Sequence, residues 1–246
     1  MNKGTTPEGV QGDEQVSRWV RGMFSQVAPR YDLLNHLLSL NIDKYWRSRT
    51  VREVREVSRR DGSVALDLCC GTGDLALALE ADRGRPVLAS DFCHPMLTAA
   101  KAKTAARRFE SKIFEADALT LPLADASIDL VTVAFGFRNL VNYQAGLREM
   151  RRLLRPGGMA AILEFSQPPN AAFRAGYNWY SRNVLPAIGG ALSGSRDAYT
   201  YLPESVRKFP AAPELAGAMG EAGFSESRFI YMTGGIVALH IGRVGK

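Results

Sequence analysis

A glycine turn is the first place in this sequence where chemistry can be inferred. "LDLCCGTGDLALAL" covers residues 66–79, and Gly71, Thr72 and Gly73 separate an apolar run from a helix-like run. Glycines at such a turn let a ligand approach the backbone closely. Asp91 closes the next apolar segment, "PVLASD", where a carboxylate can accept hydrogen bonds from ribose hydroxyls. The pattern predicts a site for a ribose-containing cofactor.

The residues around the turn distinguish two classes of cofactor. "GTGDLA" approaches the dinucleotide fingerprint, but Asp74 follows the second glycine, where a carboxylate would repel a pyrophosphate. A carboxylate suits a cation or an amino group, and S-adenosylmethionine carries a sulfonium, an ammonium and no phosphate. Asp117 closes a third segment, "FEAD", and can accept from the adenine amino group while the backbone at Ala118 reads the ring edge. We predict S-adenosylmethionine as the cosubstrate; the alternative is that Asp91 and Asp117 only cap helices.

These residues need a fold that brings the ends of several strands to one edge. Strand-like and helix-like segments alternate from about residue 63, which predicts an α/β, Rossmann-like fold with a mostly parallel sheet. Seven strands are expected, with helices on both faces, over residues 63–70, 86–91, 112–117, 128–135, 159–166, 226–234 and 236–243.

The chain is long enough for one large domain, and 46% of its 246 residues are hydrophobic. Residues 1–15 are polar, and we expect them to form a disordered tail. Within the single domain over 16–246, four parts are expected: N-terminal helices over 16–60, a cofactor-binding core over 63–166, a substrate-cap insertion over 167–210, and a C-terminal helix and strands over 211–246.

Composition excludes several classes of protein. The three cysteines form neither a disulfide framework nor a metal-site spacing, and no metal is predicted. No apolar run reaches the roughly 18 residues of a membrane span, and the N-terminus lacks the apolar segment of a signal peptide. A cytoplasmic protein is expected. The net charge of +6 favours anionic partners, but the Arg and Glu spacing over residues 44–60 suits i,i+4 pairs on a solvated helix.

Several segments together resemble one family. They include "MFSQVAPRYDLLNHLLSLNIDKYWR", "LDLCCGTGDLA", "FGFRNL", "LREMRRLLRPGG" and "TGGIVALHIG", and they span residues 23–242. The chain resembles the ubiquinone/menaquinone biosynthesis C-methyltransferase family, within the class I S-adenosylmethionine-dependent methyltransferases. The resemblance implies methylation of a ring carbon on a prenylated quinol, either a demethylmenaquinol or a ubiquinol precursor. It also implies that Thr72, Asp91, Asp117 and Ala118 contact the cofactor.

The motif "FGFRN" supplies candidates for the chemistry. The quinol ring carbon becomes a nucleophile when a neighbouring hydroxyl, whose pKa is about 10, loses its proton. Arg138 follows the fourth strand and can stabilise the phenolate by its charge, while Asn139 can orient it. A guanidinium stays protonated, so Arg138 is not expected to act as the base. The alternative is that Arg138 forms a structural ion pair.

The substrate is expected to contact two other regions. Tyr31 and Asp32 in "YDLLN" form part of a lid over the ring, or else they only cap and pack a helix. The insertion offers Tyr177 and Tyr201 for an apolar, aromatic cap over the ring and the isoprenoid tail, or for an ordinary packed cap without ligand contact.

The tail of a prenylated quinol lives in the membrane, which suggests peripheral association at the inner face of the membrane. The basic N-terminal helices and a stripe of Trp19, Met23 and Phe24 could provide it, although such a stripe is more often core. Two other functions stay open: methylation of another lipophilic molecule, such as a sterol or phenol, and RNA binding or modification. No nucleic-acid partner is predicted, because the aromatic residues of the insertion lie among few arginines. A homodimer is left open.

Overall fold

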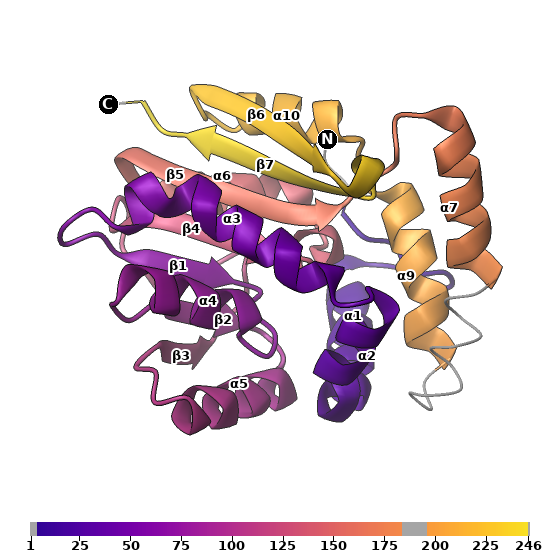
Figure 1. The fold of residues 1–246 in the computed structure, drawn as a ribbon, viewed down its shortest axis with the longest axis horizontal. Helices are drawn as coiled ribbons and strands as arrows, with labels where there is room; N and C mark the ends of the chain where they lie inside the picture. The colour runs from indigo at the N-terminus through magenta and orange to yellow at the C-terminus, as the bar shows by residue number, and fades with distance from the viewer. Residues whose placement is uncertain (1–3, 184–195, 246) are drawn as a thin grey trace.

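A seven-stranded, Rossmann-like sheet forms the centre of the molecule in the computed structural model, which describes residues 4–183 and 196–245 (Figure 1). The strand order is β3-β2-β1-β4-β5-β7-β6, and only β7 runs antiparallel to its neighbours. The strands are β1 Ala65–Leu68, β2 Leu88–Asp91, β3 Lys112–Glu115, β4 Ile128–Ala134, β5 Leu154–Phe165, β6 Glu226–Met232 and β7 Val237–Arg243. The predicted fold class is confirmed.

Helices cover both faces because neighbouring strand residues point to opposite sides. Leu66 joins one core with Leu147 and Leu215, whereas Ala65 joins a second core with Val54 and Leu79. Helices α3 and α4 therefore pack on one face, and α6 and α10 on the other (Figure 1). The helices of the sheet are α3 Ile42–Ser58, α4 Asp74–Arg83, α5 His94–Ala106, α6 Tyr143–Leu153 and α10 Ala212–Glu221.

The remaining helices gather beyond the carboxyl ends of the parallel strands, where α/β sheets bind their ligands (Figure 1). They come from the two segments expected to form caps: α1 Asp13–Val27, η1 Ala28–Arg30 and α2 Tyr31–Leu38 from the N-terminus, and α7 Ala171–Asn183 and α9 Arg196–Lys208 from the insertion. Two short helices complete the fold, η2 Phe137–Asn139 and η3 Thr233–Gly235. Residues 184–195 of the predicted insertion lie outside the described residues.

The expected disordered tail is wrong for residues 4–15. The amides of Gly4 and Thr5 donate to the carbonyls of Val141 and Leu140 at 3.0 and 2.8 Å. Thr5 is buried, and α1 begins at Asp13. The polar composition suggested disorder, but this segment is held by backbone pairing to the loop after η2, a contact that composition does not encode. We call residues 4–6 the N-terminal strap.

The strands end earlier than the apolar runs suggested. β1 ends at Leu68 and β3 at Glu115, whereas the runs continue to Cys70 and Asp117. Cys69 adopts a left-handed conformation, with φ of 52°, and so leaves the extended strand. In the other direction, β5 begins at Leu154 and includes the predicted "RPGG" turn. An apolar run in the sequence therefore predicts where a strand lies but not the residue at which it ends.

The apolar stripe of α1 faces inward. Met23 is buried, the Trp19 ring lies 5.1 Å from that of Tyr201, and the Phe24 ring lies 6.1 Å from that of Tyr31. Met23 is buried and Trp19 and Phe24 are half-buried, so the stripe packs largely against the cap, which was the alternative given for it. Among the described residues, no helix is both long and apolar enough to cross a membrane.

Candidate functional site

Two cavities lie where the caps meet the sheet. The first, with a volume of about 340 Å³, is at the ends of β1 and β2 and of the segments after β3 and β4. It contains five of the six residues predicted to bind the cofactor: Gly71, Thr72, Asp91, Asp117 and Ala118. We call it the donor cavity. The structure therefore brings five of the six predicted residues to one cavity.

The sixth residue, Gly73, serves the shape of the turn. Gly71 and Gly73 have φ of 56° and 86°, in the left-handed region that favours glycine. Gly73 caps the start of α4, and a Cβ there would lie 3.4 Å from the Cβ of Ala100. Gly73 thus brings α4 close to α5 and lies behind the cavity wall.

Asp91 lines the donor cavity, as predicted, and it also caps a helix, which was the alternative. Its Oδ1 accepts from the amide of Cys93, the N-cap of α5, and its Oδ2 accepts from the amide of Gly71, both at 2.9 Å. Burial raises the pKa of Asp91, although these amide hydrogen bonds oppose the shift. The carboxylate therefore holds the glycine turn while it also lines the cavity, and each oxygen retains a second acceptor position.

Asp117 and Ala118 form the outer wall of the donor cavity. The Asp117 side chain is exposed, and its Oδ1 accepts from the amide of Leu119 at 2.9 Å. Ala118 is buried beside it.

Asp67 is a residue of the site that the sequence reasoning missed. It is buried on β1 and lines the donor cavity. Thr132 Oγ1 donates to its Oδ1 at 2.7 Å, whereas Oδ2 has no hydrogen bond of ordinary geometry from the described residues. Burial raises the pKa of Asp67 to about 7. An acidic residue inside the apolar run "VALDL" was the available signal, since a buried carboxylate needs a partner.

Asp74 lines the donor cavity, but its carboxylate already has cationic partners within the protein. Its Oδ1 lies 2.6 Å from Lys103 Nζ, and its Oδ2 lies 3.7 Å from Arg47. Burial alone would raise the pKa of Asp74, but Arg47 and Lys103 outweigh it and hold the pKa below its usual value. Asp74 is already neutralised within the protein. The sequence reasoning treated Asp74 as free to attract a cationic ligand, whereas Lys103 and Arg47 already balance its charge.

The same lysine ties the predicted lid to the glycine turn. Lys103 Nζ lies 2.7 Å from Asp32 Oδ2 and donates to Thr72 Oγ1 at 3.1 Å. Thr72 Oγ1 donates in turn to Asp32 Oδ1 at 2.5 Å. Asp32 lies outside both cavities as the described residues outline them. Asp32 therefore anchors α2 over the donor cavity, and its predicted contact with substrate has no support in its position.

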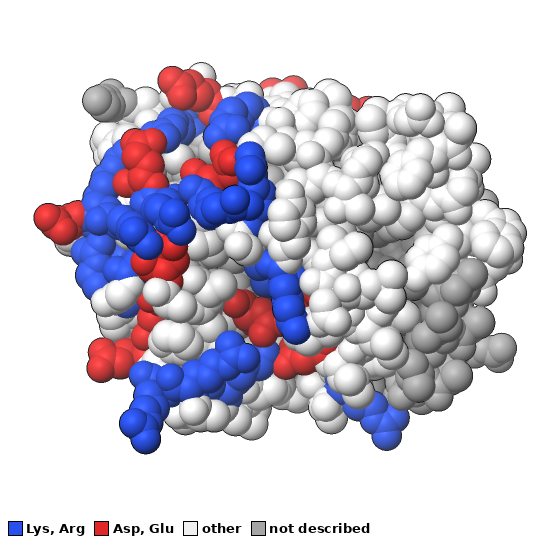
Figure 2. Space-filling model, in the orientation of Figure 1, with Lys and Arg blue, Asp and Glu red and all other residues white. Residues whose placement is uncertain are grey.

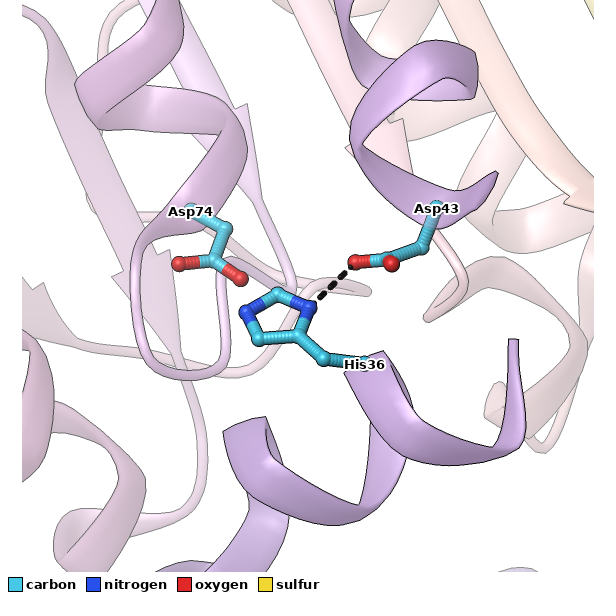
Figure 3. A group of neighbouring side chains, drawn as sticks. All are labelled: His36, Asp43 and Asp74. Atoms are coloured by element: carbon cyan, nitrogen blue, oxygen red, sulfur yellow. Dashed lines mark hydrogen bonds and ion pairs between the residues drawn. The ribbon is translucent and has the colours of Figure 1, made fainter. Parts of the chain in front are cut away.

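A cluster of His36, Asp43 and Asp74 lies beside this network (Figure 3). His36 Nδ1 lies 2.8 Å from Asp43 Oδ2, and Arg47 forms a short ion pair with the same oxygen. Burial favours a raised pKa for Asp43, but Ser39 and Arg47 outweigh it and lower the pKa. Because both carboxylates have cationic partners, we interpret the cluster as an ion-pair network that joins α2, α3 and α4.

The second cavity, with a volume of about 320 Å³, lies between the two caps. Three of the residues predicted from the sequence line it: Tyr31, Tyr177 and Tyr201. Burial raises the pKa of all three tyrosines, that of Tyr177 to about 12, so their hydroxyls stay protonated, and Tyr201 already donates its proton to Asn139. We call it the acceptor cavity.

The two cavities share a wall. Phe24, Tyr31, Arg47 and Phe135 line both of them. Tyr31 comes from the N-terminal cap and Phe135 from the end of β4, so the shared wall lies where the cap closes on the sheet. We call this position the junction. Among the described residues these four are the ones that line both cavities, so a group in one cavity would meet a group in the other here.

Arg138 lines the acceptor cavity. It also forms a structural ion pair, which was the alternative to a role in the chemistry. Its Nη1 lies 2.9 Å from Glu164 Oε1 and donates to the carbonyl of Phe135 at 2.6 Å. Both partners of the ion pair are buried. Burial lowers the pKa of Arg138, but Glu164 and nearby tyrosines outweigh it and raise the pKa, so the guanidinium stays charged.

Asn139 and Tyr201 connect the two cavities. Asn139 lines the donor cavity and Tyr201 the acceptor cavity, and Tyr201 Oη donates to Asn139 Oδ1 at 2.9 Å. Thr5 Oγ1 lies 2.6 Å from the same hydroxyl. The sequence reasoning missed Thr5 because it assigned the strap to a disordered tail. The strap thus supports a polar contact at the site.

The comparisons with known proteins agree with this geometry. The model of the ubiE/COQ5 methyltransferase family matches residues 10–244. The chain belongs to the ubiE/COQ5 methyltransferase family. It is 49% identical over 221 residues to a "Demethylmenaquinone methyltransferase" of Thermus thermophilus, covering 89% of this chain and 99% of that protein. It is 44% identical to a "Ubiquinone/menaquinone biosynthesis C-methyltransferase UbiE" of Syntrophotalea carbinolica, covering 94% and 96%. The resemblance is confirmed, and the protein is a methyltransferase.

Solved structures support the fold alone. An S-adenosylmethionine-dependent methyltransferase of Aquifex aeolicus has a TM-score of 0.59 at 18% identity, covering 79% of this chain and 89% of that one. The [4+2]-cyclase SpnF has a TM-score of 0.65 at 16% identity and covers 99% of both chains. Since the two titles describe different reactions, the fold does not decide the substrate.

Proposed function

We propose that the protein transfers the methyl group of S-adenosylmethionine to a ring carbon of a prenylated quinol, converting demethylmenaquinol to menaquinol. A ubiquinone precursor is the second candidate acceptor. The observation that carries the proposal is the junction. Among the described residues, a cavity lined by carboxylates and an aromatic cavity share the wall formed by Phe24, Tyr31, Arg47 and Phe135. The names of the relatives support the class of substrate.

The donor cavity fits the polar groups of S-adenosylmethionine. Asp67 lines this cavity and suits the ammonium, because a buried carboxylate gains most from a cationic partner. Asp91 can accept from the ribose hydroxyls, and Asp117 with the Ala118 backbone can bind the adenine edge. When bound, the donor supplies an electrophilic methyl group on sulfur, which must lie at the junction to be reached.

The acceptor cavity fits a quinol ring and the start of its tail. Aromatic residues offer stacking surfaces, and the three neutral tyrosines can hydrogen-bond to ring oxygens. Arg138 lies close enough to line this space, and its charge favours the phenolate over the phenol. Glu164 neutralises part of that charge, so Arg138 acts with the Asn139–Tyr201 contact to orient the ring. The new carbon–carbon bond would form as the carbon–sulfur bond breaks, with S-adenosylhomocysteine as the leaving group, and the ring proton would then pass to water.

Two other functions receive less support. RNA binding needs unpaired basic residues on one face, whereas basic and acidic side chains alternate over α3 and α4 (Figure 2). Arg55 and Arg59 both pair with Asp82, for example. Methylation of a phenol without a prenyl tail would leave most of the apolar acceptor cavity unused.

The test is a methyl-transfer assay with labelled S-adenosylmethionine and purified protein. Demethylmenaquinol, a reduced ubiquinone precursor and a phenol without a tail are offered separately. Label in a quinol and not in the phenol supports the proposal, and the faster quinol identifies the physiological acceptor. Label in the phenol alone would replace the proposal with a small-phenol methyltransferase.

The proposed place of action is the cytoplasm, at the inner face of the membrane. The support is the substrate, whose tail partitions into lipid, and not the α1 stripe, which packs largely against the cap.

A further inference from the structure

Large apolar side chains are exposed mainly around the caps. Seven such residues are exposed among those that the structure describes, and six of them lie on α2, α7 or the segments next to α2. Leu33, Leu40 and Trp179 have the largest exposed fractions, 68%, 76% and 65%. We define the apolar rim as five of these residues: Leu33, Leu37, Leu40, Tyr45 and Trp179. Scattered apolar residues are normal on a surface, but a group of large ones marks an interaction site.

Two leucines of the rim lie on one side of their helix. Leu33 and Leu37 are four residues apart on α2 and so share one side of it, and Leu40 lies in the turn just after its end. Leu34, between them, is buried. The helix thus buries one side in the protein and presents leucines on the other, with nothing covering them among the described residues.

Part of the rim adjoins the acceptor cavity. Leu38 and Leu40 line the cavity on the α2 side, and Leu40 is at the same time largely exposed, so the cavity reaches the surface there. On the α7 side, Asn178 and Tyr180 line the cavity and flank Trp179 in the sequence. Apolar side chains therefore stand on two sides of the route into the cavity.

The charged side chains are distributed unevenly over the surface. Figure 2 shows almost no charged side chains over α7 and α9, whereas Lys, Arg, Asp and Glu crowd over α4 and the far end of α3. Next to the rim, Lys44 is exposed and adjoins Tyr45. An apolar surface of leucine and tryptophan with a lysine at its edge is the combination found on proteins that lie in a lipid interface.

We propose that the apolar rim seats the protein on a lipid bilayer, with the opening of the acceptor cavity against the lipid. The inference rests on the proposed function, because an apolar substrate tail could then pass from the bilayer into the cavity without crossing water. A second copy of this chain fits less well as the occupant, since it would cover the opening through which the substrate must enter.

The first test measures binding to vesicles. Wild-type protein is floated with phosphatidylcholine vesicles, with and without phosphatidylglycerol, beside the double variant Leu33→Gln/Leu37→Gln. Glutamine keeps the helix propensity, and neither leucine lines a cavity. Tyr231→Gln, at an exposed residue of β6 outside the rim, is the matched control. We expect the wild type and the control to bind and the double variant to bind about tenfold more weakly.

The second test separates the rim from the proposed function. The double variant is assayed with the quinol embedded in vesicles and with a short-tailed quinol dissolved in water. We expect activity to fall about tenfold on the embedded substrate and to stay unchanged on the soluble one.

Equal vesicle binding by the wild type and the double variant would overturn the proposal for this face. So would a wild type that ignores vesicles but forms a dimer that the double variant lacks, because the rim would then join two copies. If neither quinol is methylated by the wild type, the proposed function fails, and vesicle binding alone decides the role of the rim.

Discussion

The donor and acceptor cavities are built in different ways. The donor cavity takes its predicted ligand residues from short segments at the ends of successive strands, as with Gly71, Asp91 and Asp117. The acceptor cavity takes its polar residues from three distant parts of the chain, as with Tyr31, Arg138 and Tyr201, and its neighbour Thr5 comes from the N-terminal strap. A cofactor site can therefore be carried by a local pattern, whereas the substrate site depends on how separate segments pack.

The largest effect is expected at the buried ion pair beside the acceptor cavity. Glu164→Gln removes the charge that pairs with buried Arg138, and an unpaired buried guanidinium should lower the free energy of unfolding by about 3–5 kcal/mol. Chemical denaturation measures it. Asp125→Asn breaks an exposed pair with Arg152 and should change stability by less than about 1 kcal/mol. Equal losses in both variants would show that the Arg138 pair has no special weight.

A smaller effect, confined to the donor cavity, is expected from Asp67→Asn. An amide keeps the shape but loses the charge for the ammonium, so the Kd for S-adenosylmethionine should rise about 10- to 100-fold. Calorimetry measures the Kd. The KM for the quinol should stay unchanged, since Asp67 lines only the donor cavity. A raised KM with an unchanged Kd would contradict the separation of the two cavities.

The pH dependence of S-adenosylmethionine binding is a second test of the role of Asp67. Because the pKa of Asp67 is about 7 in the folded protein, a cation binds best once this carboxyl has ionised. Affinity for S-adenosylmethionine should increase up to about tenfold per pH unit below 7 and level off above it. Without ligand, the raised pKa means that stability falls as pH rises from about 4 to 7. Asp67→Asn should remove both effects, and a titration that is the same in this variant would assign them to another group.

The smallest effect concerns the acceptor side. Thr5→Val removes the contact with Tyr201 and should cost about 0.5–1.5 kcal/mol of stability. It should also raise the KM for the quinol a few-fold and leave the Kd for the donor unchanged. Thr6→Val, at the exposed neighbour, is the control. If both variants behave alike, the strap does not support the substrate site.

The same contrast explains what the sequence could predict. Strand and helix periodicity predicted the sheet, and the glycine turn with Asp91 and Asp117 predicted most of the donor cavity, because these signals are local. Asp67 was missed because it lies inside an apolar strand, and the cationic partners of Asp74 were missed because Lys103 and Arg47 come from other helices.

The sequence predicted individual residues of the acceptor cavity but not which of them contact one another. Tyr177 and Tyr201 were expected at the substrate and do line the cavity, but nothing in the sequence joins Tyr201 to Thr5. Asp32 was expected there as well and instead holds Thr72. Contacts between segments far apart in the chain depend on tertiary packing, which residue types and spacing do not encode.

The central claim is that methyl transfer takes place at the junction. A crystal structure with S-adenosylhomocysteine and a non-reactive quinol analogue tests it most directly. We predict the sulfur in the donor cavity beside Phe135 and Tyr31, with the quinol ring in the acceptor cavity and its open carbon facing the sulfur. A ring bound outside the acceptor cavity, or separated from the sulfur by the side chains of the junction, would contradict the account.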